Sequence, residues 1–185
     1  MPSRLRKKGA VASDPYAVAL RLMRARSPEF ARIASLLRTA SESGDRRADY
    51  ALGTWYLHGR HLPKSIRIGT RLIARAARAG VPDAMFDYAV SLEKGTGVAR
   101  NERKAALWFL AAALSGMTRA SFEVGRHLYH GIGFPKDRAQ SRVWLDFAAG
   151  RLTGYSNKVD AQFGTGEKPR SATRQKSDTH GPPSR

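Results

Sequence analysis

The chain has 185 residues, and its 33 Lys and Arg against 15 Asp and Glu give a net charge of +18. It has no cysteine, which excludes disulfide frameworks, cysteine-ligated metal sites and thiol nucleophiles. The longest purely apolar run, from Ala105 to Leu114, is too short to span a bilayer, so we expect no transmembrane segment. The basic first residues are not followed by the apolar run of a signal peptide, which predicts a cytoplasmic protein.

The chain divides into two polar ends and a long middle. Residues 1–11 and 155–185 are dominated by Gly, Ser, Pro, Lys and Arg, so we expect a disordered basic arm and a disordered basic tail. Residues 12–154 are rich in Ala and Leu and lack the alternating β-branched runs of strands. This middle is therefore predicted to be all-helical.

A 36-residue period runs through most of the middle. It divides the chain into units at 48–83, 84–119 and 120–154. Apolar or small residues at positions 1, 3, 5, 6 and 9 of a unit predict one buried face of a first helix. Each unit then has a glycine suited to end that helix and a polar residue suited to cap a second one. These are Gly59, Gly95 and Gly131, followed by Ser65, Asn101 and Asp137.

Residues 12–47 fit a degenerate unit that precedes the three clear ones. Ser27-Pro28 predicts the start of its second helix, and Gly44 follows the expected end of that helix. The glycine loop is missing, which is typical of an atypical capping unit in a repeat array. At the other end no clear capping helix follows the last unit, so we expect the last helix pair to expose apolar surface.

The unit resembles the Sel-1-like repeat, a relative of the tetratricopeptide repeat. The second unit carries the resemblance best, with Gly95-Thr96-Gly97-Val98, Asn101, Lys104-Ala105, Trp108 and Ala112-Ala113. The first unit departs from it, because His61 replaces a loop glycine and Gly69 replaces an alanine. The resemblance implies an all-α, right-handed α-solenoid of antiparallel helix pairs. It also implies a non-catalytic protein-interaction module or adaptor with a concave helical surface.

The first candidate site is that concave surface, which the first helices line in such an architecture. Positions 4, 8 and 11 of each unit point away from the predicted core face. Trp55 at position 8 is either an exposed anchor for a partner or a core residue packed on the degenerate unit. The candidate groove residues are Trp55, His58, Asp87, Ser91, Glu123 and His127, with Lys94 and His130 at the same positions.

The second candidate site is a basic stripe on one face of a second helix, formed by Arg67, Arg71, Arg75 and Arg78. Such a stripe either meets phosphates or an acidic protein, or is only the solvated face of an amphipathic helix. We expect a protein partner. The net positive charge is compatible with an acidic one. Binding of nucleic acid or another anionic surface is the alternative.

Catalytic motifs are missing from the sequence, so we expect no enzyme activity, cofactor or small-molecule substrate. His58 and His61, and His127 and His130, have a spacing found in metal sites. A site needs three or four ligands, however, and Glu123 is the only carboxylate close in sequence to either pair. We expect no metal.

Overall fold

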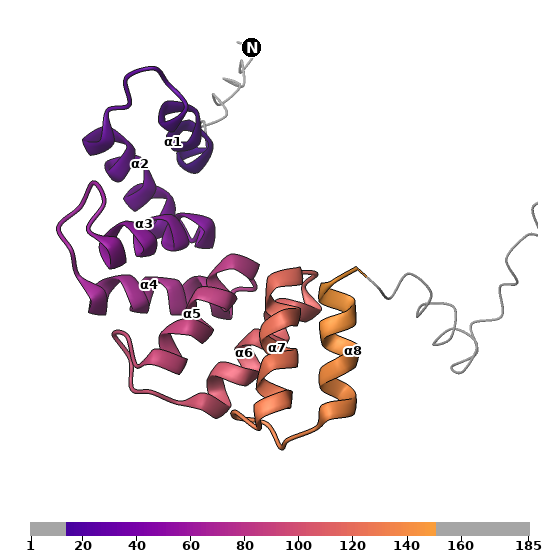
Figure 1. The fold of residues 1–185 in the computed structure, drawn as a ribbon. Helices are drawn as coiled ribbons and strands as arrows, with labels where there is room; N and C mark the ends of the chain where they lie inside the picture. Colours follow the sequence, from indigo (N-terminus) through magenta and orange to yellow (C-terminus); the bar gives the residue numbers. More distant parts are fainter. Residues whose placement is uncertain (1–13, 151–185) are drawn as a thin grey trace, which may run out of the picture. The chain divides into compact units, whose positions relative to one another are not determined.

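A computed structural model describes residues 14–150 (Figure 1). This range is helical without any strand, and each helix contacts the next one along the chain. The expected all-α solenoid of antiparallel helix pairs is therefore confirmed. The helices are α1 (Pro15–Met23), α2 (Phe30–Glu42), α3 (Arg46–His58), α4 (Ile66–Arg78), α5 (Pro82–Lys94), α6 (Glu102–Leu114), α7 (Thr118–His130) and α8 (Arg138–Ala148).

The ends of the repeat helices lie where the 36-residue period predicts them. Gly95 follows α5 with φ 72°, a left-handed conformation that favours glycine, and Gly59 and Gly131 do the same after α3 and α7. Asn101 caps α6, where its side-chain oxygen accepts a hydrogen bond of 2.8 Å from the backbone N–H of Lys104. The loop between the two helices of a repeat is thereby fixed at both ends.

The departures of the first repeat from the family pattern have structural causes. A Cβ added to Gly69 would lie 2.7 Å from the backbone nitrogen of Leu57, because α3 and α4 approach closely there. His61 adopts φ 59° at the position that Gly97 occupies in the next repeat. Its ring stacks on that of Phe30, with centroids 3.5 Å apart. The loop of the first repeat thus packs on α2 through an aromatic pair.

The degenerate unit forms a real helix pair, α1 and α2, but its second helix starts later than predicted. The sequence pointed to Ser27-Pro28, whereas α2 begins at Phe30 with Glu29 as its N-cap and no side-chain capping bond. Asp14 instead supplies a capping bond one helix earlier, by accepting from the N–H of Tyr16 at 3.0 Å. The start of α2 is held by the packing of Phe30 rather than by a cap.

The last helix pair exposes apolar side chains, as expected. Among the residues of α8, only Ser141 is buried, whereas α4 and α6 each bury a full helical face. Phe122 on α7 and Phe147 on α8 are about half exposed. The predicted arm at 1–11 and tail at 155–185 lie outside the described residues.

Candidate functional site

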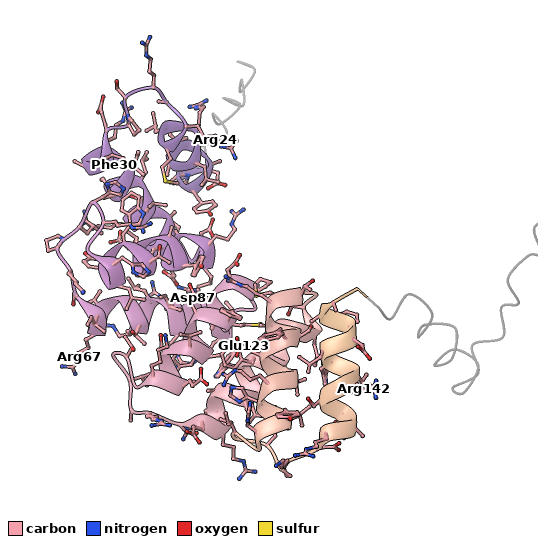
Figure 2. All side chains as sticks on the ribbon, in the orientation of Figure 1. Arg24, Phe30, Arg67, Asp87, Glu123 and Arg142 are labelled. Carbon is pink, nitrogen blue, oxygen red and sulfur yellow. The ribbon has the colours of Figure 1, made fainter. Side chains whose placement is uncertain are left out.

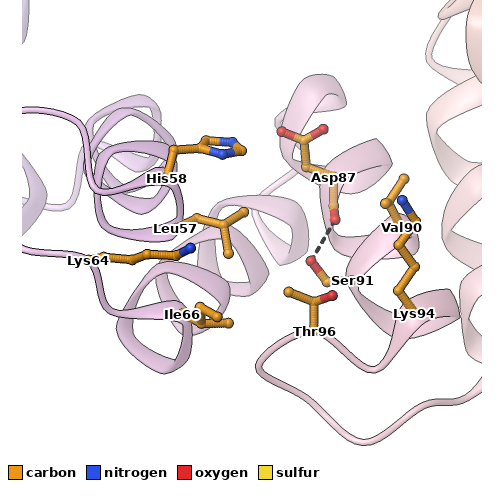
Figure 3. A pocket seen from close by; sticks show the side chains of 9 residues that line it. All are labelled: Leu57, His58, Lys64, Ile66, Asp87, Val90, Ser91, Lys94 and Thr96. Atoms are coloured by element: carbon orange, nitrogen blue, oxygen red, sulfur yellow. Dashed lines mark hydrogen bonds between the residues drawn. The ribbon is translucent and has the colours of Figure 1, made fainter.

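A depression with a volume of about 310 Å³ lies where α3, α4 and α5 meet. In Figure 3 the His58 ring and the Asp87 carboxylate point toward one another across it, and the Lys64 side chain extends between the helices. Three of the predicted groove residues, His58, Asp87 and Ser91, are therefore brought together. The lining consists of Leu57, His58, Lys64, Ile66, Asp87, Val90, Ser91, Lys94 and Thr96.

Asp87 is the acidic group of this groove, and it is held in place by α3. The hydroxyl of Tyr50 on α3 donates a hydrogen bond of 2.9 Å to its carboxylate. Burial raises the pKa of Asp87, and the hydrogen bond from Tyr50 offsets part of that rise. Burial also raises the pKa of Tyr50, so its hydroxyl stays a hydrogen-bond donor at neutral pH. The carboxylate therefore has a fixed orientation toward the groove.

The basic side chains of the groove are exposed by comparison. His58 and Lys94 occupy position 11 of the first and second repeats and are both exposed. Lys64 precedes the N-cap of α4 and is also exposed. Sequence reasoning placed Lys64 in a basic stretch but not in the groove. Its position directly before Ser65, the predicted N-cap of the second helix, places it in the loop between the two helices and could have indicated this.

Position 8 of the repeat is buried, which corrects the prediction that Trp55 and His127 line the groove. Trp55, Ser91 and His127 all occupy that position, and all are buried. The physical reason is that a first helix packs against two second helices, its own and that of the preceding unit. Position 8 faces the preceding unit. Ser91 still lines the groove, but through a hydroxyl that donates to the carbonyl oxygen of Asp87 at 2.9 Å.

Trp55 is a core residue on the degenerate unit, which was the alternative that the sequence left open. Its indole is only 8% exposed. It meets Phe30 of α2 edge-on at 6.2 Å and His61 at 4.8 Å between ring centroids. The tryptophan thus joins the degenerate pair to the first repeat and is not available to a partner.

His127 is likewise internal. Its Nδ1 lies 2.9 Å from the carbonyl oxygen of Ile132, and its ring meets Phe109 of α6 edge-on. Because a carbonyl oxygen only accepts, Nδ1 carries the proton and Nε2 accepts from Arg126 at 3.1 Å. Burial lowers the pKa of His127, so the ring is neutral at pH 7.

Glu123 is half-buried, and its carboxylate forms an ion pair with Arg126. Nε of Arg126 donates to its carboxylate at 2.7 Å, and Nη2 of the same arginine donates to Glu93 on α5 at 2.6 Å. Glu123 therefore helps to hold α7 on α5. Of the six predicted groove residues, His58 and Asp87 are the two that line the depression with side chains that are not fully buried.

The basic stripe on α4 is divided in two. Arg67, Arg71 and Arg78 are exposed, whereas the guanidinium of Arg75 is bound to the carboxylate of Asp49 on α3. Asp49 was not predicted from the sequence. Asp49 is at position 2 of the unit, outside the predicted core face, so the 36-residue pattern gave no signal for it.

Metal binding finds no support in residues 14–150, where no cluster of three or more His, Asp or Glu side chains is placed to hold an ion. Within the same range, no helix is long and apolar enough to cross a membrane.

The comparisons with known proteins agree with this architecture. The Sel1 repeat family model matches residues 46–81, 82–117 and 118–150, together more than half of the chain. The chain belongs to the Sel1 repeat family. The matched segments begin two residues before the predicted units, at the first residues of α3, α5 and α7.

Two solved structures illustrate the likeness. The protective antigen c5321 of uropathogenic Escherichia coli, which displays an SLR fold, matches with a TM-score of 0.70 and 24% identity. The match covers 82% of this chain and 33% of that one. A Sel1 repeat protein from Oxalobacter formigenes matches with a TM-score of 0.67 and 26% identity over 75% of this chain and 55% of that one. The chain thus spans about a third and about half of these two proteins.

Proposed function

We propose that the chain is a non-catalytic protein-interaction module whose groove between α3, α4 and α5 binds an extended segment of a protein partner. The observation that carries the proposal is the depression itself, which combines exposed cations with apolar side chains. An acidic side chain of the partner would lie between Lys64 and Lys94. Its apolar neighbour would contact Leu57, Ile66 and Val90.

The chemistry of the groove favours a peptide over a small molecule. Its polar groups are spread over α3, α5 and the loops that follow them, and no nucleophile–base pair is present among its lining residues. Asp87 supplies one fixed acceptor for a backbone or side-chain donor of the bound segment. The excess of basic groups favours an acidic partner, because opposite charge raises the rate of encounter.

Peptide display with the full chain as bait tests the proposal. We expect selection of peptides that carry Asp or Glu at one fixed position. Replacing Lys64 and Lys94 with Ser should remove that preference. Lys136→Ser is the matched control, since Lys136 occupies the place of Lys64 two repeats later and does not line the depression. If no peptide is enriched, or if the double variant selects the same peptides, the groove is not the binding site.

Nucleic-acid binding is the second candidate, and the exposure of Arg67, Arg71 and Arg78 on α4 favours it. Contacts of this kind release counterions, so affinity should fall linearly in log salt. Titration with DNA and RNA over a salt series tests it. Lack of binding at low salt would remove this candidate.

A further inference from the structure

The second helices of the three repeats each carry an outward row of side chains, and the 36-residue period relates these rows. We call them the outer rows. From α4 to α8 their chemistry changes from basic to apolar. The rows are Arg67, Arg71, Arg75 and Arg78 on α4; Arg103, Leu107, Ala111 and Leu114 on α6; and Ala139, Val143 and Phe147 on α8.

The apolar members of the outer rows are exposed to an unusual degree. Leu114 is 73% exposed and Leu107 is 51% exposed, and they lie two turns apart on the same face of α6. Phe147 and Val143 on α8 are 49% and 39% exposed. Leu107 and Val143 occupy equivalent positions of successive repeats, and with Leu114 and Phe147 they expose apolar area of the kind that marks an interaction surface.

The charged members of the outer rows are all cationic. Arg67, Arg71, Arg78 and Arg103 are exposed, and the rows contain no carboxylate. Only Arg75 is neutralised, by Asp49. The exposed leucines of α6 thus lie one repeat away from the arginines of α4, in rows that contain no carboxylate.

We propose that the outer rows form a peripheral contact with an anionic lipid bilayer. Arg67, Arg71 and Arg78 would meet headgroup phosphates, while Leu107 and Leu114 enter the boundary between headgroups and acyl chains. The contact lies on the surface and spans nothing. It uses no residue that lines the groove, so it does not depend on the proposed peptide site.

The leucines favour a bilayer over nucleic acid. Phosphate contacts from arginine serve both partners equally, but a phosphate backbone offers no apolar phase for an aliphatic side chain. A bilayer interface offers both, and its binding strength adds buried apolar area to electrostatic attraction. A nucleic-acid contact would therefore depend on the arginines alone.

Vesicle co-sedimentation of the full chain tests the proposal. The probes are vesicles of phosphatidylcholine alone and of phosphatidylcholine with about 30% phosphatidylglycerol, at about 0.1 M and 0.5 M salt. We expect binding to the anionic vesicles only. Arg71→Gln with Arg78→Gln should weaken it about thirtyfold, from about 1 kcal/mol for each arginine.

The leucine variant gives the decisive comparison. Leu107→Gln with Leu114→Gln should weaken vesicle binding about tenfold and leave binding to double-stranded DNA unchanged. Phe122→Gln is the matched control, because Phe122 is equally exposed but lies on α7, outside the outer rows. All variants keep the same chain ends, and Gln preserves helicity.

Three results would overturn the proposal. The first is an absence of binding to anionic vesicles at low salt. The second is binding of the leucine variant equal to that of the unmodified chain, which would leave a purely electrostatic surface. The third is binding to DNA without binding to vesicles, which would make the partner a nucleic acid.

Discussion

The guanidinium of Arg75 on α4 binds the carboxylate of Asp49 on α3. The side chain of Asp49 is completely buried. Nε of Arg75 donates to Oδ2 at 2.6 Å, and the hydroxyl of Ser41 on α2 donates to Oδ1 at 2.5 Å. Arg46 adds a further bond at 2.8 Å. One carboxylate therefore ties the degenerate unit to both helices of the first repeat (Figure 2 shows the side chains on the ribbon).

Arg75→Gln should lower the free energy of unfolding by about 2–3 kcal/mol, because removing one partner leaves a buried charge less compensated. Arg71→Gln on the same helix should change it by less than about 0.5 kcal/mol, since that side chain is exposed. Urea denaturation of both variants measures the difference. Equal effects would mean that the ion pair contributes nothing beyond a surface contact.

Asp49→Asn should destabilise the protein in a pH-dependent way. Burial alone raises the pKa of Asp49, but the bonds from Arg75, Ser41 and Arg46 outweigh burial and hold the pKa below its ordinary value. A lowered folded pKa gives stability that is complete above the ordinary carboxyl pKa of about 3.9 and is lost as pH falls below it. The free energies of unfolding of the two proteins, measured by urea denaturation, should differ by about 3 kcal/mol at pH 7 and converge progressively as the pH falls below about 4.

Asp87→Asn should have the opposite sign. Burial raises the pKa of this carboxyl in the folded state, so its ionisation costs stability as pH rises through that raised value. An amide keeps an acceptor for the Tyr50 hydroxyl without the charge. We therefore expect a urea midpoint at pH 7 that is equal to or above that of the unmodified chain. A clear loss of stability would show that the ionised carboxylate is favourable there.

His127→Gln should make the free energy of unfolding less sensitive to mild acidification than it is in the unmodified chain. The lowered pKa of His127 means that the folded state resists protonation, so stability falls as pH drops through the ordinary value of about 6.5. Arg126, Glu93 and Glu123 are the charged groups nearest to the ring. Urea midpoints between about pH 7.5 and 5.5 measure the slope, which is at most about 1.4 kcal/mol per pH unit for one histidine. The control is His130→Gln, which replaces an exposed histidine on the same helix and keeps the buried ring of His127.

Gly69→Ala should destabilise the protein by about 1–3 kcal/mol, although alanine is the residue that the family pattern favours there. Its Cβ would meet the backbone nitrogen of Leu57 at 2.7 Å and the carbonyl oxygen of Gly53 at 2.8 Å. Backbone atoms at such distances yield only if α3 and α4 separate. Thermal unfolding measures the cost, and an unchanged midpoint would mean that the helices shift freely.

The sequence predicted the helix ends because they depend on local backbone conformation. Gly59 and Gly95 adopt the left-handed geometry that only glycine accepts readily, so their spacing was sufficient. Burial at Trp55 and His127 was not predictable in the same way. A single core face on a helical wheel accounts for packing against one neighbouring helix. Each first helix of a repeat packs against two neighbouring helices, so it has a second buried face that the wheel did not show.

The pairing of Asp49 with Arg75 was hidden for a related reason. The two residues are 26 positions apart and recur in neither of the later repeats, where Met85 and Ser121 replace the aspartate. A periodic pattern reports what the repeats share. This bond is specific to the first repeat and became visible only with the packing of α2, α3 and α4.

The burial of position 8 fixes the order in which the repeats can stand. Each repeat fills that position with a side chain matched to the unit before it, and the three side chains differ greatly in size: Trp55, Ser91 and His127. Exchanging two repeats would place an indole where a hydroxyl fits, or leave a void beside Phe30. A chain in which two of these units were exchanged would therefore need a compensating change at position 8, so this position identifies the neighbour that each repeat requires.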